Sequence, residues 1–186
     1  MGTDNGWQSP EGLKEVLMYY AGIGSRKTPR DILELMTKIG RSFYSKGWIL
    51  RSGGADGADS AFAADVPPDG KQIFLPWPKF NGVESDYSEP KDWTFPLAEK
   101  FHPRWDKLSQ GAQKLHARNV HQVLGPDEYS APHSALIVCW TPSNNEGGTG
   151  QALRIARYYD IPIFNLRDPI KINELREFYA ALSTNK

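Results

Sequence analysis

The feature of this sequence that most restricts its fold is an alternation of short apolar runs with longer segments of helical spacing. The run "SALIVCW" at 134–140 is almost continuously apolar, which is typical of a parallel strand covered on both faces. Other short apolar runs lie at 16–24, 48–52, 72–77 and 161–166, and segments of helical spacing lie at 28–47, 58–66, 108–125, 148–160 and 172–182. The alternation predicts an α/β fold with a mainly parallel sheet of five or more strands and helices on both faces.

The segment at 28–47 is the clearest of the predicted helices. Its apolar side chains recur at helical spacing, at Ile32, Leu35, Met36, Ile39 and Phe43. Thr28 is the expected N-cap, and Pro29 suits the first helical position. Gly47 is expected to end the helix.

The pattern breaks at 77–106, where prolines, aromatic residues and charges follow one another without a period. Loops of this length within compact domains tend to be functional, so the segment is predicted to be an inserted loop or lid in a single domain spanning 1–186. Most of its aromatic side chains are expected to pack inward, with one or two near a ligand, and they are Trp77, Phe80, Tyr87, Trp93, Phe95 and Trp105. The polar segment 1–12 is expected to be a flexible terminus.

Composition excludes several classes of protein. Lysine plus arginine and aspartate plus glutamate number 22 each among the 186 residues, so the formal net charge is zero and no global basic field favours nucleic acid. The single cysteine, Cys139, excludes a disulfide or thiolate metal site within one chain and is interpreted as a buried apolar residue. No apolar run reaches the roughly 20 residues of a membrane span, and no signal-peptide pattern is present, which predicts a cytoplasmic protein.

Three turns that follow predicted strands share a glycine-rich design, in "AGIGSRKTP", "RSGGADGAD" and "TPSNNEGGTGQAL". Turns of this kind meet at the carboxyl edge of a parallel sheet, where ligands bind at the point at which strand order reverses. Glycines let backbone N–H groups approach an anion, and helix N-termini favour negative charge. The residues predicted to bind phosphate are Gly22, Gly24, Ser25, Arg26, Ser52, Gly53, Gly54, Gly147, Gly148, Thr149 and Gly150. Ordinary structural turns are the alternative for each glycine cluster taken singly.

In this order, the segments "YAGIGSR", "LRSGGADGADSAF", "IFLPW", "LHARN" with "QVLG", and "EGGTGQALRIA" resemble the SLOG superfamily. This Rossmann-like group includes DprA and the LOG phosphoribohydrolases, and the resemblance is greatest to small DprA-like proteins of phages and bacteria. It covers roughly 16–166 and implies a Rossmann-like three-layer sandwich that binds nucleotides or nucleotide-derived ligands. A homo-oligomer, a dimer or higher, is also expected.

The catalytic part of that resemblance is incomplete. The LOG enzymes carry a "PGGxGTxxE" signature with a catalytic glutamate. Here Glu146 stands in place of the proline, Gln151 replaces the threonine and Arg154 replaces the glutamate. The glycines match but the catalytic carboxylate does not, so whether the protein is an enzyme is left open.

Three carboxylates near these turns are weak catalytic candidates. Asp56 and Asp59 are one helical turn apart and would share a face, where they would bind ribose hydroxyls or supply a general base. Helix capping is the alternative interpretation, and no basic partner is evident from the sequence. Glu146 would face a ribose or base, or lie exposed in its loop.

Arg118 and Asn119 interrupt the apolar pattern of 108–125 and are predicted ligand contacts through the "LHARN" match, with a solvated polar face as the alternative. His116 and His121 are five residues apart, which does not suit a shared metal, and no metal or other cofactor is predicted. The absence of a "GxGxxG" pattern argues against a dehydrogenase.

The leading hypothesis is therefore binding of a nucleotide or nucleotide-derived small molecule, such as sensing or sequestering a signalling nucleotide in phage counter-defence. One alternative is a nucleotide N-glycosidase or phosphoribohydrolase. The other is DprA-like binding of single-stranded DNA in recombination, which the neutral charge disfavours. The sequence does not identify the ligand, the oligomeric state or the pathway.

Overall fold

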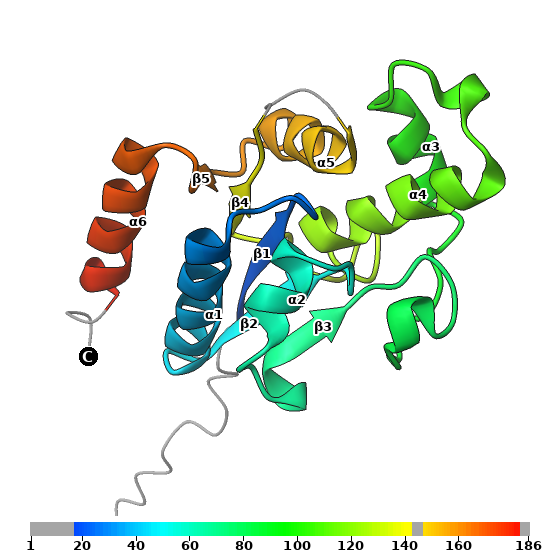
Figure 1. Ribbon diagram of the computed structural model, residues 1–186. Helices are drawn as coiled ribbons and strands as arrows, with labels where there is room; N and C mark the ends of the chain where they lie inside the picture. Colours follow the sequence, from blue (N-terminus) through cyan, green and yellow to red (C-terminus); the bar gives the residue numbers. More distant parts are fainter. Residues whose placement is uncertain (1–16, 143–146, 183–186) are drawn as a thin grey trace, which may run out of the picture.

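A computed structural model describes residues 17–142 and 147–182 of the chain. Five parallel strands form one sheet with the order β3-β2-β1-β4-β5, as Figure 1 shows. The strands are β1 (Met18–Gly24), β2 (Trp48–Ser52), β3 (Lys71–Ile73), β4 (Leu136–Trp140) and β5 (Ile163–Asn165). The helices are α1 (Arg30–Tyr44), α2 (Ala58–Ala63), α3 (Thr94–Lys100), α4 (Gln110–Leu124), α5 (Gly147–Tyr158) and α6 (Pro169–Ala181). Short 3-10 turns are η1 (Pro68–Gly70), η2 (Phe80–Gly82) and η3 (Trp105–Lys107).

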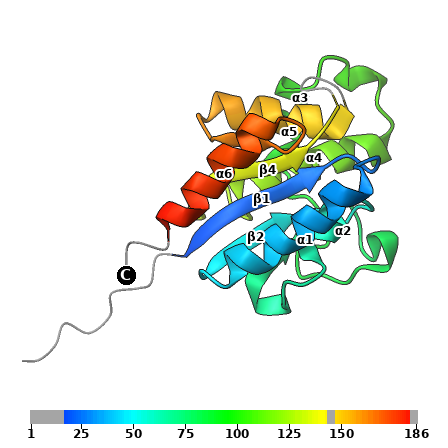
Figure 2. The ribbon, with the colours of Figure 1, turned by 60° about the vertical axis from the view of Figure 1, so that its left-hand side comes forward.

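The sheet lies between two helical layers, each with its own core (Figure 2). Tyr20 and Leu50 point to one face, where they pack with side chains from α1, α2 and α6. Ala21 and Ile23 of β1 point to the other face, where they pack with α4 and α5. The alternation follows from the two-residue period of a strand. The predicted α/β three-layer sandwich with a parallel sheet is confirmed.

The start of α1 differs from the sequence prediction. The N-cap position is Pro29 rather than Thr28, and no side chain caps the helix. The hydroxyl of Thr28 instead donates to the carbonyl of Ser25 at 2.7 Å, so this side chain closes the preceding turn. The helix ends at Tyr44 with Ser45 as its C-cap, and Gly47 follows with φ of 77°, a left-handed conformation that favours glycine. Gly47 thus lies just beyond the end of the helix, as the sequence predicts.

The predicted third strand is shorter than 72–77, because β3 ends at Ile73. The chain beyond it stays extended and pairs with the insertion. The N–H of Leu75 donates to the carbonyl of Tyr87 at 2.8 Å, and Phe74 forms a parallel bridge with Tyr87. The insertion therefore lies along the outer side of this edge strand.

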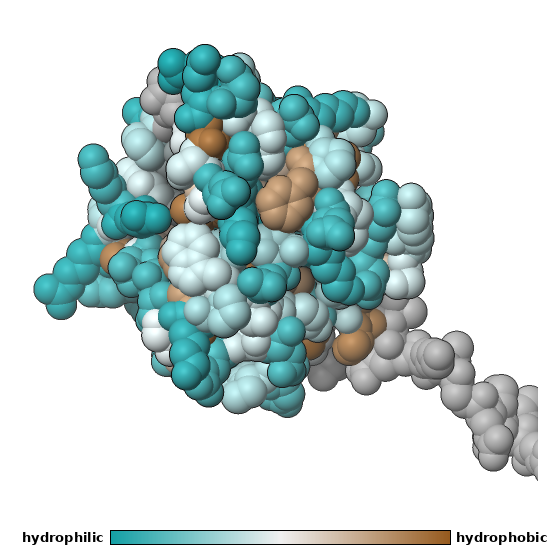
Figure 3. Space-filling view, turned by 90° about the vertical axis from the view of Figure 1, so that its right-hand side faces the viewer, coloured by the Kyte–Doolittle hydropathy of each residue, from teal (hydrophilic) through white to brown (hydrophobic). Residues whose placement is uncertain are grey.

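The insertion at 77–106 contains more structure than its sequence predicts, namely η2, α3 and η3. Ala98 of α3 is fully buried in the core that α4 and α5 form with the sheet, and Trp93, Phe95 and Trp105 pack against that core. Phe80 and Trp77 pack edge to face, with ring centroids 5.1 Å apart. The face of the molecule that carries this segment is mainly hydrophilic, with small separate hydrophobic areas (Figure 3). Most of the aromatic side chains of the insertion therefore pack inward, as the sequence predicts.

Within the described residues, no helix is both long enough and apolar enough to cross a membrane.

Candidate functional site

A cleft of about 580 Å³ opens at the carboxyl ends of β1 and β4. β1 and β4 are neighbours in the sheet, with β2 and β3 beyond β1 and with β5 beyond β4, so the strand order reverses between β1 and β4. Ligands bind at such a reversal in open α/β sheets. We call it the carboxyl-edge cleft. Its polar lining residues are Ser25, Arg26, Lys27, Asp59, His116, Arg118, Asn119, Gln122, Thr141 and Thr149, with Gly24, Gly147 and Gly148 beside them.

The first glycine turn forms one wall. Gly24 is required there because a Cβ would lie 2.8 Å from the carbonyl oxygen of Trp140 and 2.7 Å from the Cβ of Ala58. Ser25 fixes the turn, since its N–H donates to the Trp140 carbonyl at 3.0 Å and its hydroxyl accepts the Lys27 N–H at 3.0 Å. The side chains of Arg26 and Lys27 are exposed and line the cleft.

The second glycine turn contributes Ala55 and Asp59 to the lining of the cleft, and its other residues lie outside the lining. Ser52 is fully buried, and its hydroxyl donates to the carbonyl of Gly22 at 2.7 Å. Gly22 allows close packing of α2, since a Cβ would lie 2.6 Å from the ring of Phe62. Gly54 has φ of 66° and faces Leu75. Gly22 of the first turn and Ser52 and Gly54 of the second turn therefore shape the fold and do not line the cleft.

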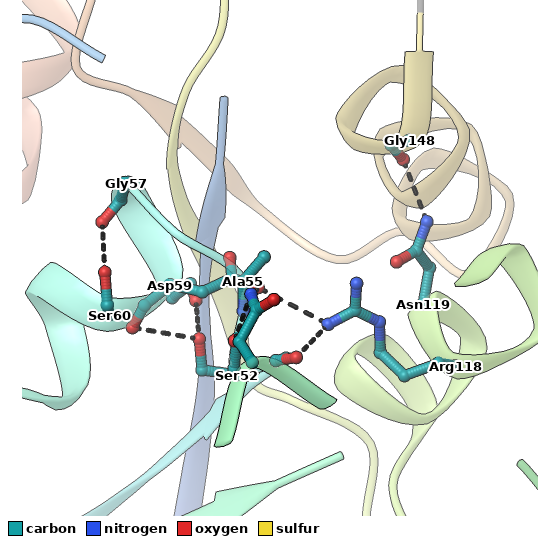
Figure 4. Close-up of polar contacts among 12 residues, drawn as sticks. Ser52, Ala55, Gly57, Asp59, Ser60, Arg118, Asn119 and Gly148 are labelled. Atoms are coloured by element: carbon teal, nitrogen blue, oxygen red, sulfur yellow. Dashed lines mark hydrogen bonds and ion pairs between the residues drawn. The ribbon is translucent and has the colours of Figure 1, made fainter. Parts of the chain in front are cut away.

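Asp59 and Arg118 meet at the base of the cleft (Figure 4). Their carboxylate and guanidinium groups are 3.4 Å apart, and both side chains are 6% exposed. The same guanidinium nitrogen donates to the carbonyl of Gly53, and the N–H of Ala55 donates to Asp59 at 3.4 Å. Gly53 permits this approach, because a Cβ would lie 1.5 Å from the guanidinium nitrogen. Arg118 is thus the basic partner of Asp59 that the sequence did not reveal.

Burial raises the pKa of Asp59, whereas Arg118 and the N–H groups of Ala55, Gly53 and Gly24 lower it. Burial lowers the pKa of Arg118, Asp59 raises it, and the nearby positive charge of Arg26 lowers it further. The Nε of Arg118 is also buried without a hydrogen-bond partner among the described residues.

The third glycine turn supplies the opposite wall through α5. Asn119 donates to the carbonyl of Gly148 at 3.1 Å (Figure 4). It also donates to the side-chain oxygen of Gln151 at 3.1 Å. Gly147, Gly148 and Thr149 line the cleft, while Gly150 is buried behind it. Glu146 lies outside the described residues.

Asp56 does not share a face with Asp59 as the sequence predicts. It lies exposed in the turn before α2, whereas Asp59 is 4% exposed within the helix. The helix begins only at Ala58, so the two positions are not one turn apart on a helix. Asp56 is absent from the lining of the cleft.

The structure also brings in residues that the sequence did not single out as ligand contacts. Lys27 follows Arg26 at the mouth, and Gln122 and His116 line the cleft one helical turn to either side of Arg118–Asn119. The sequence spacing of His116, Asn119 and Gln122 could have predicted that all three line the cleft, since residues three apart lie on one face of a helix. His121 points elsewhere, stacked on Phe74 with ring centroids 5.2 Å apart.

The charges of the described lining residues are unequal. Arg26, Lys27 and Arg118 are cationic, and Asp59 is the carboxylate among them. Because Asp59 is already bound by Arg118 and backbone N–H groups, the cleft retains an excess of positive charge. In the described part of the chain, no group of three or more His, Cys, Asp or Glu side chains could hold a metal ion.

A second hollow of about 520 Å³ lies at the carboxyl end of β5. Its charged lining residues are Arg157, Arg167, Lys171 and Asp168. The guanidinium of Arg167 donates to the carbonyl of Pro142, which lines the carboxyl-edge cleft. The two hollows are therefore neighbours along one edge of the sheet.

The sheet and the placement of this cleft define an α/β protein of Rossmann-like architecture. No protein-family profile matches the chain, and no curated protein matches it. Among solved structures, the chain is similar to DNA processing protein A from Helicobacter pylori, whose structure was described for its single-stranded DNA binding mode. The identity is 19%, the match covers 86% of this chain and 72% of that chain, and the TM-score is 0.48.

Proposed function

We propose that the carboxyl-edge cleft binds a phosphate-bearing nucleotide or nucleotide-derived ligand. The observation that carries this proposal is the unbalanced positive charge of the cleft. Its described lining residues include Arg26, Lys27 and Arg118, whereas their one carboxylate, Asp59, is already paired with Arg118. An excess of cationic side chains in one cleft favours a bound anion, and arginine suits the geometry of phosphate.

The walls of the cleft suggest where each part of the ligand lies. The first turn offers Arg26 and Lys27, and the opposite wall offers the N-terminal residues of α5, Gly148 and Thr149. A phosphate between them would meet side-chain cations on one side and the positive end of a helix on the other. The rest of the ligand would extend along α4 toward Leu115 and His116.

Binding is better supported than hydrolysis of an N-glycosidic bond. A hydrolase needs a carboxylate that can reach the bond, but the Asp59 carboxylate is buried and engaged by Arg118 and by backbone N–H groups. Arg154, which stands where the LOG enzymes have glutamate, donates to the carbonyl of Phe101 at 2.9 Å. No cofactor or catalytic residue enters the proposal.

Single-stranded DNA is the second candidate ligand, and it is the interpretation that agrees with the description of the similar solved structure. In this chain it is supported by the second hollow, where Arg157 and Arg167 extend the positive charge along the sheet edge. Lys171, the third cation of this hollow, is paired with Glu174 at 2.6 Å. A strand carries a phosphate at every nucleotide and would contact both hollows, whereas a mononucleotide would contact one.

The two candidates are separated by one titration series. The protein is titrated by calorimetry with mononucleotides, with cyclic and dinucleotides, and with a single-stranded oligonucleotide, while chromatography monitors release of free base. We expect Arg26→Ala to weaken the ligand that binds by about tenfold or more, because a hydrogen bond to a charged group is lost. Arg30→Ala is the matched control, since Arg30 is an exposed arginine on α1 that pairs only with the exposed Glu34 among described residues.

A double variant, Arg167→Ala with Lys171→Ala, should weaken the oligonucleotide and leave a mononucleotide unchanged. If no nucleotide and no oligonucleotide binds the parent protein, or if Arg26→Ala binds as the parent does, the proposed function is wrong. Release of free base would instead support the hydrolase. A homo-oligomer, a role in phage counter-defence and a cytoplasmic location stay predictions of the sequence.

A further inference from the structure

His116 lines the carboxyl-edge cleft from α4 and is held by a chain of buried amide groups. Its Nδ1 lies 2.9 Å from the side-chain oxygen of Gln151. Its Nε2 makes no hydrogen bond to any residue that the structure describes, and it is absent from the buried polar atoms without a partner. The ring therefore has one nitrogen that contacts Gln151 and one without a hydrogen-bond partner among the described residues.

The orientation of Gln151 determines which ring nitrogen carries the proton. The side chain of Gln151 is fully buried, and its NH₂ group donates to the backbone carbonyl of Ala98 at 3.0 Å. A backbone carbonyl can only accept, so the other end of the amide must be the oxygen. That oxygen accepts from Asn119, whose own NH₂ group is directed by the Gly148 carbonyl at 3.1 Å.

The same oxygen must also accept from His116, which requires a proton on Nδ1. Burial lowers the pKa of His116. Arg154 of α5 and Arg118 of α4 lower it further, as does His102 beside it when the His102 ring is protonated. Gln151 acts in the opposite direction. In the neutral ring with Nδ1 protonated, Nε2 is a hydrogen-bond acceptor.

We propose that His116 contacts the bound nucleotide directly, with Nε2 accepting a hydrogen bond from a hydroxyl or amino group of the ligand. The inference rests on the proposed function and makes it more specific. Arg26, Lys27 and Arg118 offer donors and select an anion, whereas Nε2 offers an acceptor. The cleft then distinguishes a nucleotide from inorganic phosphate, because only the nucleotide presents a donor at a distance from its phosphate. Gln151 acts as a positioning residue through His116.

The first test is made on the free protein and does not depend on a ligand. Two-bond ¹H–¹⁵N correlation spectra at pH 7 should show the His116 ring with the proton on Nδ1, and the resonance is assigned by its loss in His116→Asn. Gln151→Glu should raise the pKa of His116, because a carboxylate replaces the amide oxygen. A ring protonated on Nε2, or charged at pH 7 in the parent protein, would overturn the inference.

The second test measures binding of adenosine 5′-monophosphate, its 2′,3′-dideoxy analogue, its analogue without the 6-amino group, and inorganic phosphate. One of the two nucleotide analogues should bind the parent protein about fivefold to tenfold more weakly than the monophosphate, as expected for one lost hydrogen bond. The analogue that is weakened tells whether the sugar or the base donates.

His116→Asn keeps an NH₂ donor that can reach Gln151 but has no atom at the position of Nε2. It should therefore weaken the monophosphate by the same factor and bind both analogues equally. Inorganic phosphate should bind the variant as it binds the parent. His133→Asn, at an exposed histidine outside the cleft, is the control. A His116→Asn variant that still distinguishes the analogues would contradict the inference while leaving the proposed function intact. Failure of the parent to bind any of the four probes or an oligonucleotide would instead contradict the proposed function, and the ligand contact with it.

Discussion

The guanidinium of Arg118 lies 3.4 Å from the carboxylate of Asp59, and the two side chains come from opposite faces of the sheet. Asp59 belongs to α2, which lies on the same face of the sheet as α1 and α6, whereas Arg118 belongs to α4, which packs with α5 on the other face. The pair therefore joins the two helical layers across the carboxyl ends of the strands. The pair forms the base of the cleft.

Replacement of Asp59 by asparagine should be strongly destabilising. It leaves the Arg118 guanidinium buried without an opposite charge, and breaking a buried ion pair costs about 3–5 kcal/mol of unfolding free energy. Urea denaturation of the parent and the variant measures the difference. Asp56→Asn is the matched control, because this exposed neighbour should change the free energy by less than about 0.5 kcal/mol. Equal effects at both positions would show that the pair contributes no more than a surface charge.

Gly53→Ala should displace the Arg118 guanidinium, since the added methyl group would lie 1.5 Å from its nitrogen and 2.7 Å from the Asp59 carboxylate. We expect a loss of about 1–3 kcal/mol of unfolding free energy, as for other overpacked sites, together with loss of nucleotide binding. Gly111→Ala is the control within α4, where the nearest atom would be 3.9 Å away. That change should stabilise the helix by about 0.5–1 kcal/mol, and a Gly53→Ala variant of parental stability would contradict the observed contact.

His121 should make the folded protein sensitive to acid. Its Nδ1 lies 2.8 Å from the Gly125 carbonyl and its Nε2 accepts the Lys91 N–H at 3.1 Å, so a second proton has no place in the fold. Burial is the main cause that lowers its pKa from 6.5 to about 4. Below pH 6.5 the His121 ring takes up a proton in the unfolded chain, whereas in the folded chain it stays neutral down to about pH 4. The free energy of unfolding should therefore fall by about 3 kcal/mol in total across this window, and stay constant above it for this residue.

The measurement for His121 is urea denaturation at several pH values between 7 and 4, on the parent and on His121→Gln. Glutamine does not titrate, so the difference between the two curves gives the contribution of His121 without that of the other histidines. Parallel curves would show that the ring titrates alike in the folded and unfolded chain.

Cys139 should be unreactive in the folded protein. The thiol is fully buried in β4, and burial raises its pKa to about 12, so almost no thiolate forms at neutral pH. A thiol reagent such as iodoacetamide should label the native chain far more slowly than the chain in urea, as measured by mass spectrometry. Labelling at similar rates would mean that β4 opens readily.

The order of elements could be predicted from the sequence because each element has its own local signal. The run at 134–140 is apolar on both faces, and Ile32, Met36 and Phe43 recur at helical spacing, so β4 and α1 follow from pattern. The N-cap was misplaced because the Thr28 hydroxyl donates to the turn carbonyl of Ser25 and does not accept from a helix N–H. Strand order depends on contacts between distant segments, which no local pattern records.

The site was predicted in outline but not in its chemistry. Glycine turns placed Arg26, Gly148 and Thr149 at one edge, since the carboxyl ends of parallel strands must meet there. The pairing of Asp59 with Arg118 joins residues 59 positions apart and therefore left no local trace. Gly22 and Ser52 looked like ligand contacts, yet the same small size and hydroxyl serve close packing and an internal hydrogen bond.

The contact of the insertion with β3 has a consequence unrelated to any ligand. An exposed edge strand offers unpaired backbone groups to other chains and promotes aggregation. Here Tyr87 accepts from Leu75, and the hydroxyl of Ser85 donates to the carbonyl of Ile73, so the segment occupies positions that a foreign strand would take. The insertion thus protects the edge of the sheet from pairing with another chain. A chain shortened at 77–106 would expose this edge and should aggregate more readily.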